Sequence, residues 1–393
     1  MKRLTFELEF ITPAFIGGAN HQAELRPASF VGLLRWWWMA LKGECNIEKL
    51  REEEVKIFGG IAKNQRKEEI KMASPVYLRV EGDVSKDKGL IKKYGLDLIF
   101  DEKKRAFFGS HIGVGYIYYF IILPKKEKNG QEEERREFIE PGSRLKLTLI
   151  GKDEVLNHYI ASIWALVFLG GVGARSRRGG GNLAVVGYKP KDLVEDLKIS
   201  FTPTNDIHEW LKENLKRAKE LVGSPKTPCG EYGECECEYS TLPDPRNIGF
   251  NSVLILSPKE FNNWVEALND IGNEFMKFRK IKNERKNEQN KRNEEFAIDI
   301  AVFGLPLRYG KGEAVKVENT KEVITRRSSP VIIKVIKTSN GKYKWMALRL
   351  WGRFLPEGAK LRFRGYTKLP SFNLIEKFFQ NFGGEVKEEG KNE

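Results

Sequence analysis

Residues 170–181, GGVGARSRRGGG, combine glycines and arginines in a pattern suited to binding phosphate. Glycine allows a backbone with positive φ, and consecutive exposed N–H groups can form a nest that binds an anion. Arginine adds a forked, charged donor that matches phosphate oxygens. The segment therefore predicts a cradle for a phosphodiester backbone, with a surface loop that binds nothing as the alternative. The expected contacts are Arg175, Arg177, Arg178, Gly171, Gly173 and Gly179.

Other phosphate-binding and catalytic motifs are excluded. Gly171-x-Gly173 follows a predicted helix rather than a strand and lacks the third glycine of a dinucleotide fingerprint. The chain has no Walker-type GxxxxGK string. No arrangement of acidic residues suggests a two-metal nuclease, and no Ser-His-Asp pattern or nucleophile elbow is recognisable.

A second candidate segment runs from residue 17 to residue 38. Arg26 and Arg35 would extend a basic surface, and Trp36 lies off the predicted core face, where it could stack on a base or pack against a second domain. Because imidazole in general titrates near neutral pH, His21 could act as a general acid or base, or it could contact RNA. Because no partner acid or base is near it in sequence, RNA contact is the expected role and catalysis the alternative.

Two further arginines, Arg326 and Arg327, precede a predicted strand, where a loop could present them to phosphate. The basic run 276–295 is typical of a solvated helix face. The late cysteines lack the paired spacing of a zinc site, so no metal and no cofactor are predicted. Incidental or redox-active thiols, not a disulfide framework, are expected for the four cysteines, which are Cys45, Cys229, Cys235 and Cys237.

Composition narrows the class of protein. Among 393 residues, 68 Lys and Arg outnumber 54 Asp and Glu, which gives a formal charge of +14 and favours a polyanionic partner. A hydrophobic fraction of 40% supports packed cores and excludes wholesale disorder. The first residues do not resemble a signal peptide, and no run of about 18 apolar residues occurs. We therefore expect a cytoplasmic protein without a membrane partner.

The elements that must position these residues follow from hydrophobic periodicity. In the first half the order is strand, helix, strand, strand, helix, strand, which is the ferredoxin-like unit. This predicts one domain over 1–190, with a hairpin of strands 112–123 and 144–150 carrying a charged insertion. The other predicted elements are a strand at 3–11, a helix from Pro27 to Lys42, short strands at 74–80 and 96–100, a helix at 154–169 and a strand at 182–188.

The second half predicts a degenerate copy of the same unit over 191–393, with a helical and a cysteine-containing insertion. Asn340-Gly341 is a two-residue hairpin signal between its last two strands. The predicted elements are a helix at 206–222, a strand at 252–257, a helix from Pro258, strands at 296–303, 314–318, 330–337 and 342–350, and a helix at 371–382. The predicted fold class is thus α+β, with two tandem ferredoxin-like domains.

ITPAFIGGANHQAELRPASFVGLLRWWWMALKGE near the start, together with LGGVGARSRRGGGNL at 169–183, resembles the RAMP proteins of CRISPR systems. Within them the sequence is most similar to subunit one of the Cmr (type III-B) RNA-targeting complex, as are AVFGLPLRYG at 301–310 and RRSSPVIIK at 326–334. The resemblance implies a subunit that does not slice RNA. It would bind single-stranded RNA, guide or target, and pack against other RAMP subunits at the end distal to the guide's 5′ tag.

Relatives often carry an aromatic between the glycines where this chain has Gly179-Gly180-Gly181, so base stacking from the loop itself is not expected. Two alternatives stay open. One is a metal-independent endoribonuclease that processes guide RNA, with His21 as acid or base. The other is a purely structural assembly subunit whose basic surface meets acidic protein neighbours.

Overall fold

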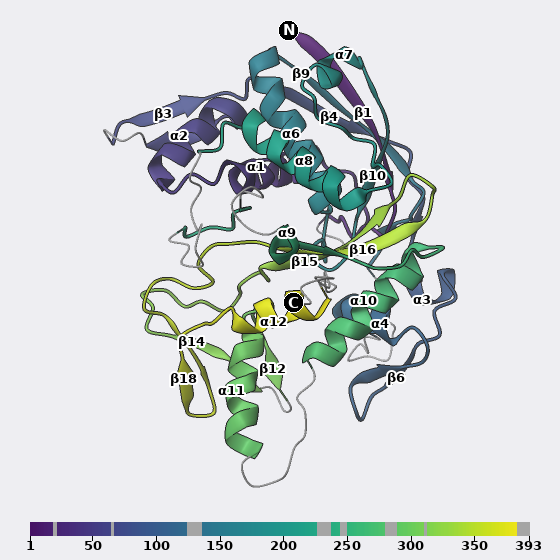
Figure 1. The fold of residues 1–393 in the computed structure, drawn as a ribbon, viewed down its shortest axis with the longest axis vertical. Coiled ribbons are helices and arrows are strands. Elements are labelled where there is room, and N and C mark those ends of the chain that lie inside the picture. Colours follow the sequence, from purple (N-terminus) through teal and green to yellow (C-terminus); the bar gives the residue numbers. More distant parts are fainter. Residues whose placement is uncertain are drawn as a thin grey trace, which may run out of the picture.

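The chain folds around two antiparallel sheets with helices packed on them, as a computed structural model shows (Figure 1). The structure describes residues 1–393 apart from 19–21, 64–66, 124–135, 226–236, 244–249, 280–288, 310–312 and 383–393. Mixed helix and antiparallel sheet is the class that the hydrophobic pattern predicts. Among the described residues, no helix is long and apolar enough to cross a bilayer.

The first sheet has the strand order β10-β1-β9-β4, with every neighbouring pair antiparallel. Its strands are β1 (Lys2–Phe10), β4 (Tyr77–Glu81), β9 (Arg144–Gly151) and β10 (Leu183–Lys189). Helix α1 (Pro27–Lys42) follows β1, and helix α6 (Asp153–Leu169) follows β9; the two helices pack against each other and against the sheet. In β1 the even-numbered side chains from Leu4 to Phe10 are buried, as the alternation predicts.

The second sheet has the order β11-β16-β15. Its strands are β11 (Leu254–Leu256), β15 (Val331–Lys337) and β16 (Tyr343–Arg349), and the predicted turn at Asn340-Gly341 joins the last two. Both faces of this sheet are buried. On β15, Ile332 and Ile336 contact the first hydrophobic core, whereas Ile333 and its alternate neighbours contact the second. The second sheet is therefore the wall shared by the two cores.

The remaining elements surround these sheets. The helices are α2 (Ile47–Phe58), α3 (Leu90–Lys93), α4 (Ile112–Ile117), α5 (Tyr119–Ile122), α7 (Asp192–Glu195), α8 (Ile207–Leu221), α9 (Phe250–Val253), α10 (Trp264–Arg279), α11 (Gln289–Ala301) and α12 (Asn373–Phe382). The strands are β2 (Gly60–Lys63), β3 (Glu69–Met72), β5 (Lys86–Asp87), β6 (Ile99–Asp101), β7 (Ala106–Phe108), β8 (Phe138–Ile139), β12 (Arg308–Tyr309), β13 (Glu313–Ala314), β14 (Lys316–Glu318), β17 (Lys360–Phe363) and β18 (Tyr366–Lys368).

Core membership crosses residue 190 in both directions. Helix α8 packs on α6 and contributes Trp210 and Leu215 to the first core. Helix α4 packs on α10 and contributes Val114 to the second core. The two halves are therefore interlocked through these helices as well as through β15 (Figure 1).

The predicted strand at 112–123 is wrong, because α4 and α5 occupy this segment and β4 pairs with β9 instead. Gly113 allows close packing of two helices, and Gly115 lies against the Phe107 side chain. The backbone of Gly113 lies against Asn269 and Gly272 of α10, so closely that a Cβ at either glycine would overlap the other helix's backbone.

The predicted strand at 296–303 is also wrong, because helix α11 ends at Ala301. Ala297, Ile298 and Ala301 are buried at helical spacing, and the polar residues before them continue the same helix. Most of the basic run 276–295 lies outside the described residues or has undescribed side chains.

The close crossing of α4 and α10 gives a stability prediction. Gly113→Ala should lower the free energy of unfolding by about 2–3 kcal/mol, because the added methyl group must push the two helices apart. Urea denaturation would measure it. Gly32→Ala is the matched control: a Cβ at Gly32 of α1 meets no atom within 4 Å, so the change should stabilise by roughly 0.5–1 kcal/mol. Equal effects of the two variants would contradict the proposed packing.

Two cysteines depart from the expectation of free thiols. Cys45 and Cys237 are each disulfide-bonded. The reason is that the cysteine-containing segment folds back along the end of α1, where the Leu242 amide donates to Ala40 O at 2.9 Å and Tyr239 Oη donates to Glu44 O at 2.6 Å. The other two cysteines, Cys229 and Cys235, lie outside the described residues.

Candidate nucleic-acid interface

The glycine-arginine loop, residues 170–181, is fixed between the two sheets. On one side the Gly181 amide donates to Pro13 O at 2.8 Å. On the other side, Gly179 N donates to Ile333 O at 2.8 Å and Ile333 N donates to Arg177 O at 3.1 Å, which pairs the loop with β15. The loop is therefore an ordered part of the junction between the two halves rather than a free surface loop.

The glycines of this loop face protein. A Cβ at Gly171 would lie 2.6 Å from Gly180 O, one at Gly173 would lie 2.7 Å from Phe15 O, and one at Gly179 would lie 2.5 Å from Leu268 Cδ1. Gly171 and Gly179 are also buried. Tight packing of the chain on itself explains why glycine stands at these positions, so we do not assign them the predicted contact with an RNA backbone.

Arg178 is committed to the protein interior. Its Nη1 donates to Val331 O at 2.8 Å and its Nη2 donates to Phe303 O at 3.0 Å. Its guanidinium lies 4.9 Å from the centre of the Phe275 ring. Burial, reinforced by nearby arginines, lowers the pKa of Arg178 to about 9. This arginine ties the loop to the second half and is not available to a phosphate.

Arg177 joins the two segments that the sequence analysis treats separately. Its Nη1 donates to Ser329 O, just after the Arg326-Arg327 pair. Its guanidinium also lies 5.0 Å from the centre of the Trp36 ring on α1. Burial, and then the charge of Arg327, lower the pKa of Arg177 to about 10, which shows that the two cations are close. One basic surface therefore includes the loop, α1 and the start of β15.

The other three arginines of this surface differ in exposure. Arg327 is half-buried, and its Nη2 donates to Arg353 O at 2.6 Å, while Arg326 is exposed. Arg175 is half-buried with a left-handed backbone, φ 62°. Its guanidinium lies 5.2 Å from the centre of the Phe120 ring, and burial lowers its pKa.

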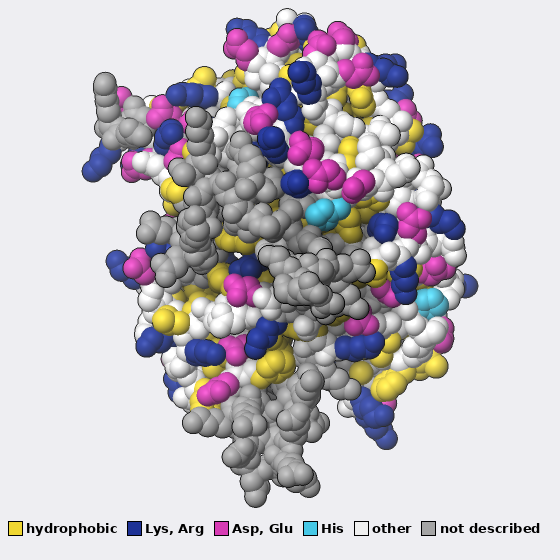
Figure 2. Space-filling view, viewed as in Figure 1, with side chains coloured by type: hydrophobic (Ala, Val, Ile, Leu, Met, Phe, Trp, Pro, Cys, Tyr) yellow, Lys and Arg dark blue, Asp and Glu magenta, His cyan; other side chains and the backbone are white. Residues whose placement is uncertain are grey.

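These arginines share one electrostatic property: none is paired with a carboxylate of the described residues. The ion pairs between described residues include many other arginines, such as Arg217, Arg362 and Arg364, but none of Arg175, Arg177 or Arg327. Elsewhere Lys and Arg are interspersed with Asp and Glu, as the face in Figure 2 shows. Uncompensated, partly desolvated cations attract an external anion. The arrangement can therefore bind phosphate.

Arg35 and Arg26 lie apart from this arrangement. Arg35 Nη2 donates to Phe58 O at 3.0 Å at the end of α2, and its Nη1 lies 3.5 Å from Glu54 Oε1. Its charge is therefore used within the first half. Arg26 is exposed immediately before α1. His21 lies outside the described residues.

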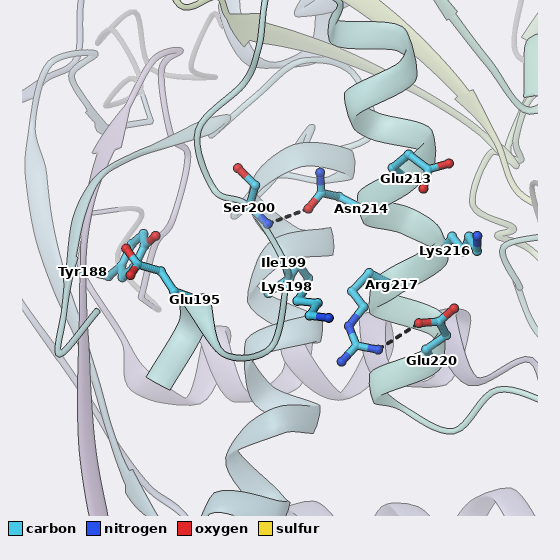
Figure 3. A pocket seen from close by; sticks show the side chains of 10 residues that line it. All are labelled: Tyr188, Glu195, Lys198, Ile199, Ser200, Glu213, Asn214, Lys216, Arg217 and Glu220. Atoms are coloured by element: carbon cyan, nitrogen blue, oxygen red, sulfur yellow. Dashed lines mark hydrogen bonds and ion pairs between the residues drawn. The ribbon is translucent and has the colours of Figure 1, made fainter. Parts of the chain in front are cut away.

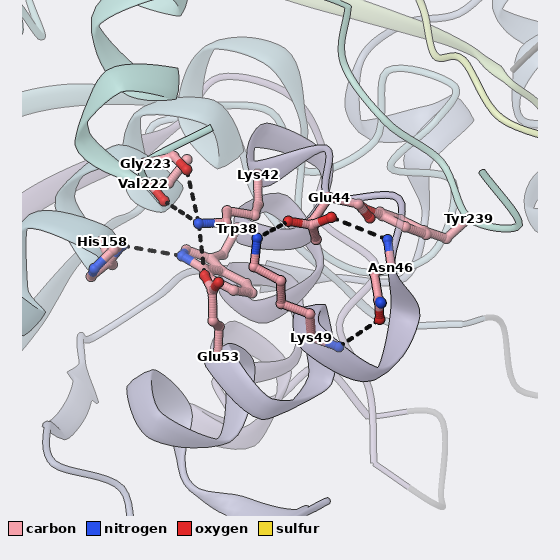
Figure 4. Close-up of polar contacts among 10 residues, drawn as sticks. All are labelled: Trp38, Lys42, Glu44, Asn46, Lys49, Glu53, His158, Val222, Gly223 and Tyr239. Atoms are coloured by element: carbon pink, nitrogen blue, oxygen red, sulfur yellow. Dashed lines mark hydrogen bonds and ion pairs between the residues drawn. The ribbon is translucent and has the colours of Figure 1, made fainter. Parts of the chain in front are cut away.

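The end of α1 that carries Lys42 is buried as well. Lys42 Nζ donates to Gly223 O at 2.8 Å at the end of α8 and lies 2.6 Å from Glu53 Oε2 (Figure 4). In the same network, Trp38 Nε1 donates to His158 Nδ1 at 3.2 Å, and burial lowers the pKa of that histidine. These contacts hold α1, α2, α6 and α8 together. Because their polar groups are hydrogen-bonded or ion-paired to one another, we assign them a structural role.

A pocket of about 470 Å³ lies elsewhere, between β10 and α8 (Figure 3). Its lining mixes three glutamates with Lys198, Lys216 and Arg217, and Arg217 already pairs with Glu220 at 2.9 Å. The carboxylates make this pocket a poor site for a phosphate backbone. No cluster of three metal-binding side chains occurs in the part of the chain that is described.

Sequence reasoning missed two features of the interface. Phe120 was assigned to a buried strand, yet it is 73% exposed beside Arg175. Lys334 on β15 is fully buried at the junction, and its Nζ donates to Gly170 O at 2.9 Å. A lysine in the apolar run VIIKVIK is the only sequence signal for the second feature.

Comparison with known proteins agrees with this fold. The RAMP superfamily model matches residues 7–184. The CRISPR system Cmr subunit Cmr1-1 of Pyrococcus furiosus is 27% identical over 94% of this chain and 93% of its own length. Subunit Cmr1-2 of the same organism is 33% identical over 47% of this chain and 96% of its own length.

Solved structures agree too. The crystal structure of apo Cmr1 from Pyrococcus furiosus has a TM-score of 0.59 at 23% identity and covers 97% of both chains. A chain of the type III-B Cmr-beta complex bound to cognate target RNA, solved by cryo-EM, has a TM-score of 0.52 at 12% identity over 97% of this chain and 98% of its own. The fold and the sequence matches define a RAMP protein. Within that superfamily, the chain belongs to the Cmr1 family.

Proposed function

We propose that this chain is a subunit of a type III-B Cmr effector complex and binds single-stranded RNA, guide or target, without cleaving it. The observation that carries the proposal is the junction of Arg175, Arg177, Arg326 and Arg327, which brings cations from both halves onto one surface without carboxylate partners among the described residues. Membership of the Cmr1 family supports the complex, because relatives are Cmr subunits and a structural neighbour is a chain of a Cmr complex bound to target RNA.

The architecture supports the same proposal. We infer that the two sheets belong to tandem ferredoxin-like units, 1–190 and 191–393, and that the central sheet of the second unit retains three strands, β11, β16 and β15. We also propose that the subunit caps the end of the complex distal to the guide's 5′ tag and packs against other RAMP subunits there. The interface with RNA would then lie between the two units, where Arg177 sits.

Removing the two loop arginines that remain available should weaken RNA binding. For Arg175→Gln/Arg177→Gln in the full chain, we expect a loss of roughly tenfold or more in affinity for a single-stranded oligoribonucleotide. The slope of log K against log salt should become less steep by about 1.4, because about 0.7 is lost for each phosphate contact to a single strand. Fluorescence anisotropy across a salt series would measure both quantities.

The matched control is Arg364→Gln, which removes an exposed arginine that pairs with Glu313 at 2.7 Å. It should leave the slope unchanged. An unchanged slope in the double variant would overturn the assignment of these arginines, and no RNA binding by the unaltered chain would favour the assembly-only role. RNA cleavage in EDTA that His21→Ala abolishes would instead indicate the endoribonuclease.

A further inference from the structure

Phe120 is an exposed ring at the edge of the basic surface. At 73% exposure it is the most exposed aromatic side chain among the described residues. Exposing a phenyl ring to water is unfavourable and does nothing for the fold. Isolated exposed apolar residues are common, so exposure alone assigns no role. Two further observations single out this ring.

The first observation is that the ring is held in place relative to the loop. Two residues earlier, Tyr118 is fully buried, donates its hydroxyl to Gly179 O at 2.9 Å and packs edge-on against Phe15 at 5.5 Å. The preceding residue, Tyr119, packs on Phe107 at 5.8 Å. After the ring, Ile121 and Ile122 pack against the second core. Phe120 therefore projects from a segment anchored on both sides, so little conformational freedom is lost when it binds a ligand.

The second observation is the partner of the ring. Arg175 has a left-handed backbone, φ 62°, which is unfavourable for a residue with a Cβ, and its guanidinium lies 5.2 Å from the centre of the Phe120 ring. No ion pair between described residues includes Arg175. The exposed end of the loop thus presents a cation and an aromatic ring next to each other.

We propose that Phe120 is a stacking platform for a base of the single-stranded RNA, with Arg175 binding an adjacent phosphate. Aromatic rings beside arginine are the combination that single-strand binding proteins use, because every base has a π-face and every nucleotide a phosphate. An apolar protein partner fits less well, since it would have to desolvate the guanidinium. The inference rests on the proposed RNA binding and supplies, from α5, the aromatic that the glycine loop itself lacks.

The test pairs protein variants with two probes: an oligouridylate and an abasic ribose-phosphate oligomer of the same length. With the full chain, Phe120→Ala should weaken oligouridylate binding roughly 5- to 100-fold and leave abasic binding unchanged. Phe120→Trp should bind oligouridylate at least as tightly as the unaltered chain. Neither change should alter the salt slope, because no charge is removed.

The control is Tyr77→Ala on β4, where the ring is 63% exposed; β4 is the edge strand opposite β10, the strand that follows the loop. It should not affect either probe. Equal affinities of Phe120→Ala and the unaltered chain for oligouridylate, or equal losses on both probes, would overturn the stacking role. Those results are distinguishable from failure of the proposed function, in which the unaltered chain would bind neither probe.

Discussion

Arg178→Ala is expected to lower the free energy of unfolding by about 3–5 kcal/mol. The substitution leaves Val331 O and Phe303 O without the guanidinium that now donates to them, and it empties the space beside the Phe275 ring. Because these partners belong to the second half and the loop to the first, we expect the junction to loosen. Urea denaturation followed by tryptophan fluorescence would measure the loss.

The control for Arg178 is a surface arginine. Arg79 on β4 is 56% exposed and pairs with Glu81, so Arg79→Ala should cost no more than about 1 kcal/mol. Arg178→Lys should recover only part of the lost stability, because one ammonium cannot reach both carbonyls in the planar arrangement of the guanidinium. A loss below about 1 kcal/mol for Arg178→Ala would contradict its structural role.

Lys334→Met is expected to stabilise the protein and to flatten its pH dependence. The Lys334 ammonium is fully buried and donates to Gly170 O across the junction, and burial lowers its pKa to about 7. The unfolded chain keeps a normal lysine pKa, so between pH 7 and 9 it binds a proton that the folded chain does not. Stability of the unaltered protein should therefore rise with pH, by about 2–3 kcal/mol over this window.

The methionine variant should lack that rise and be more stable at pH 7, because it fills similar space without a charge to desolvate. Lys337→Met is the matched control: Lys337 lies on the same strand, 35% exposed, and pairs with Glu9 at 3.0 Å. It should retain the pH dependence. A persistent rise in Lys334→Met would show that another group titrates in this window.

Arg178 and Lys334 lead to opposite expectations for a physical reason. The Arg178 guanidinium donates to carbonyls of two different segments and stacks on a ring, so its removal leaves several groups unpartnered. The Lys334 ammonium donates to a single carbonyl. Its removal therefore loses one hydrogen bond, which is worth less than the free energy needed to bury the charge.

Part of the interface was predictable from the sequence. The arginines of residues 170–181 and the Arg326-Arg327 pair were recognisable because charged, forked side chains next to glycine and serine are suited to phosphate. Their assembly into one surface was not predictable, because it depends on the pairing of Arg177 and Gly179 with Ile333 of β15, more than 150 residues away. The roles of Arg178 and Arg35 depend in the same way on distant carbonyl groups.

The two wrong strands show where periodicity fails. Residues 112–123 are short, apolar and rich in glycine, and such a run fits a buried strand and a buried helix equally well. The close backbone contact between Gly113 and Gly272 of α10 favours the helix over the strand. The apolar residues of 296–301 form the last part of helix α11, which begins at Gln289. The first part of this helix is polar, so the sequence shows no helical repeat of apolar residues there.

The sequence by itself determined three properties of this protein. They are the helices and strands whose apolar residues repeat with a clear period, the excess of positive charge, and the family. Alternation along β1 and the Asn340-Gly341 turn are local patterns, so they can be recognised without knowledge of the rest of the fold. Only the tertiary structure decided which cations meet and which are buried. Burial and pairing depend on contacts between residues far apart in the chain, and β15, with one face in each core, is the strand that brings them together.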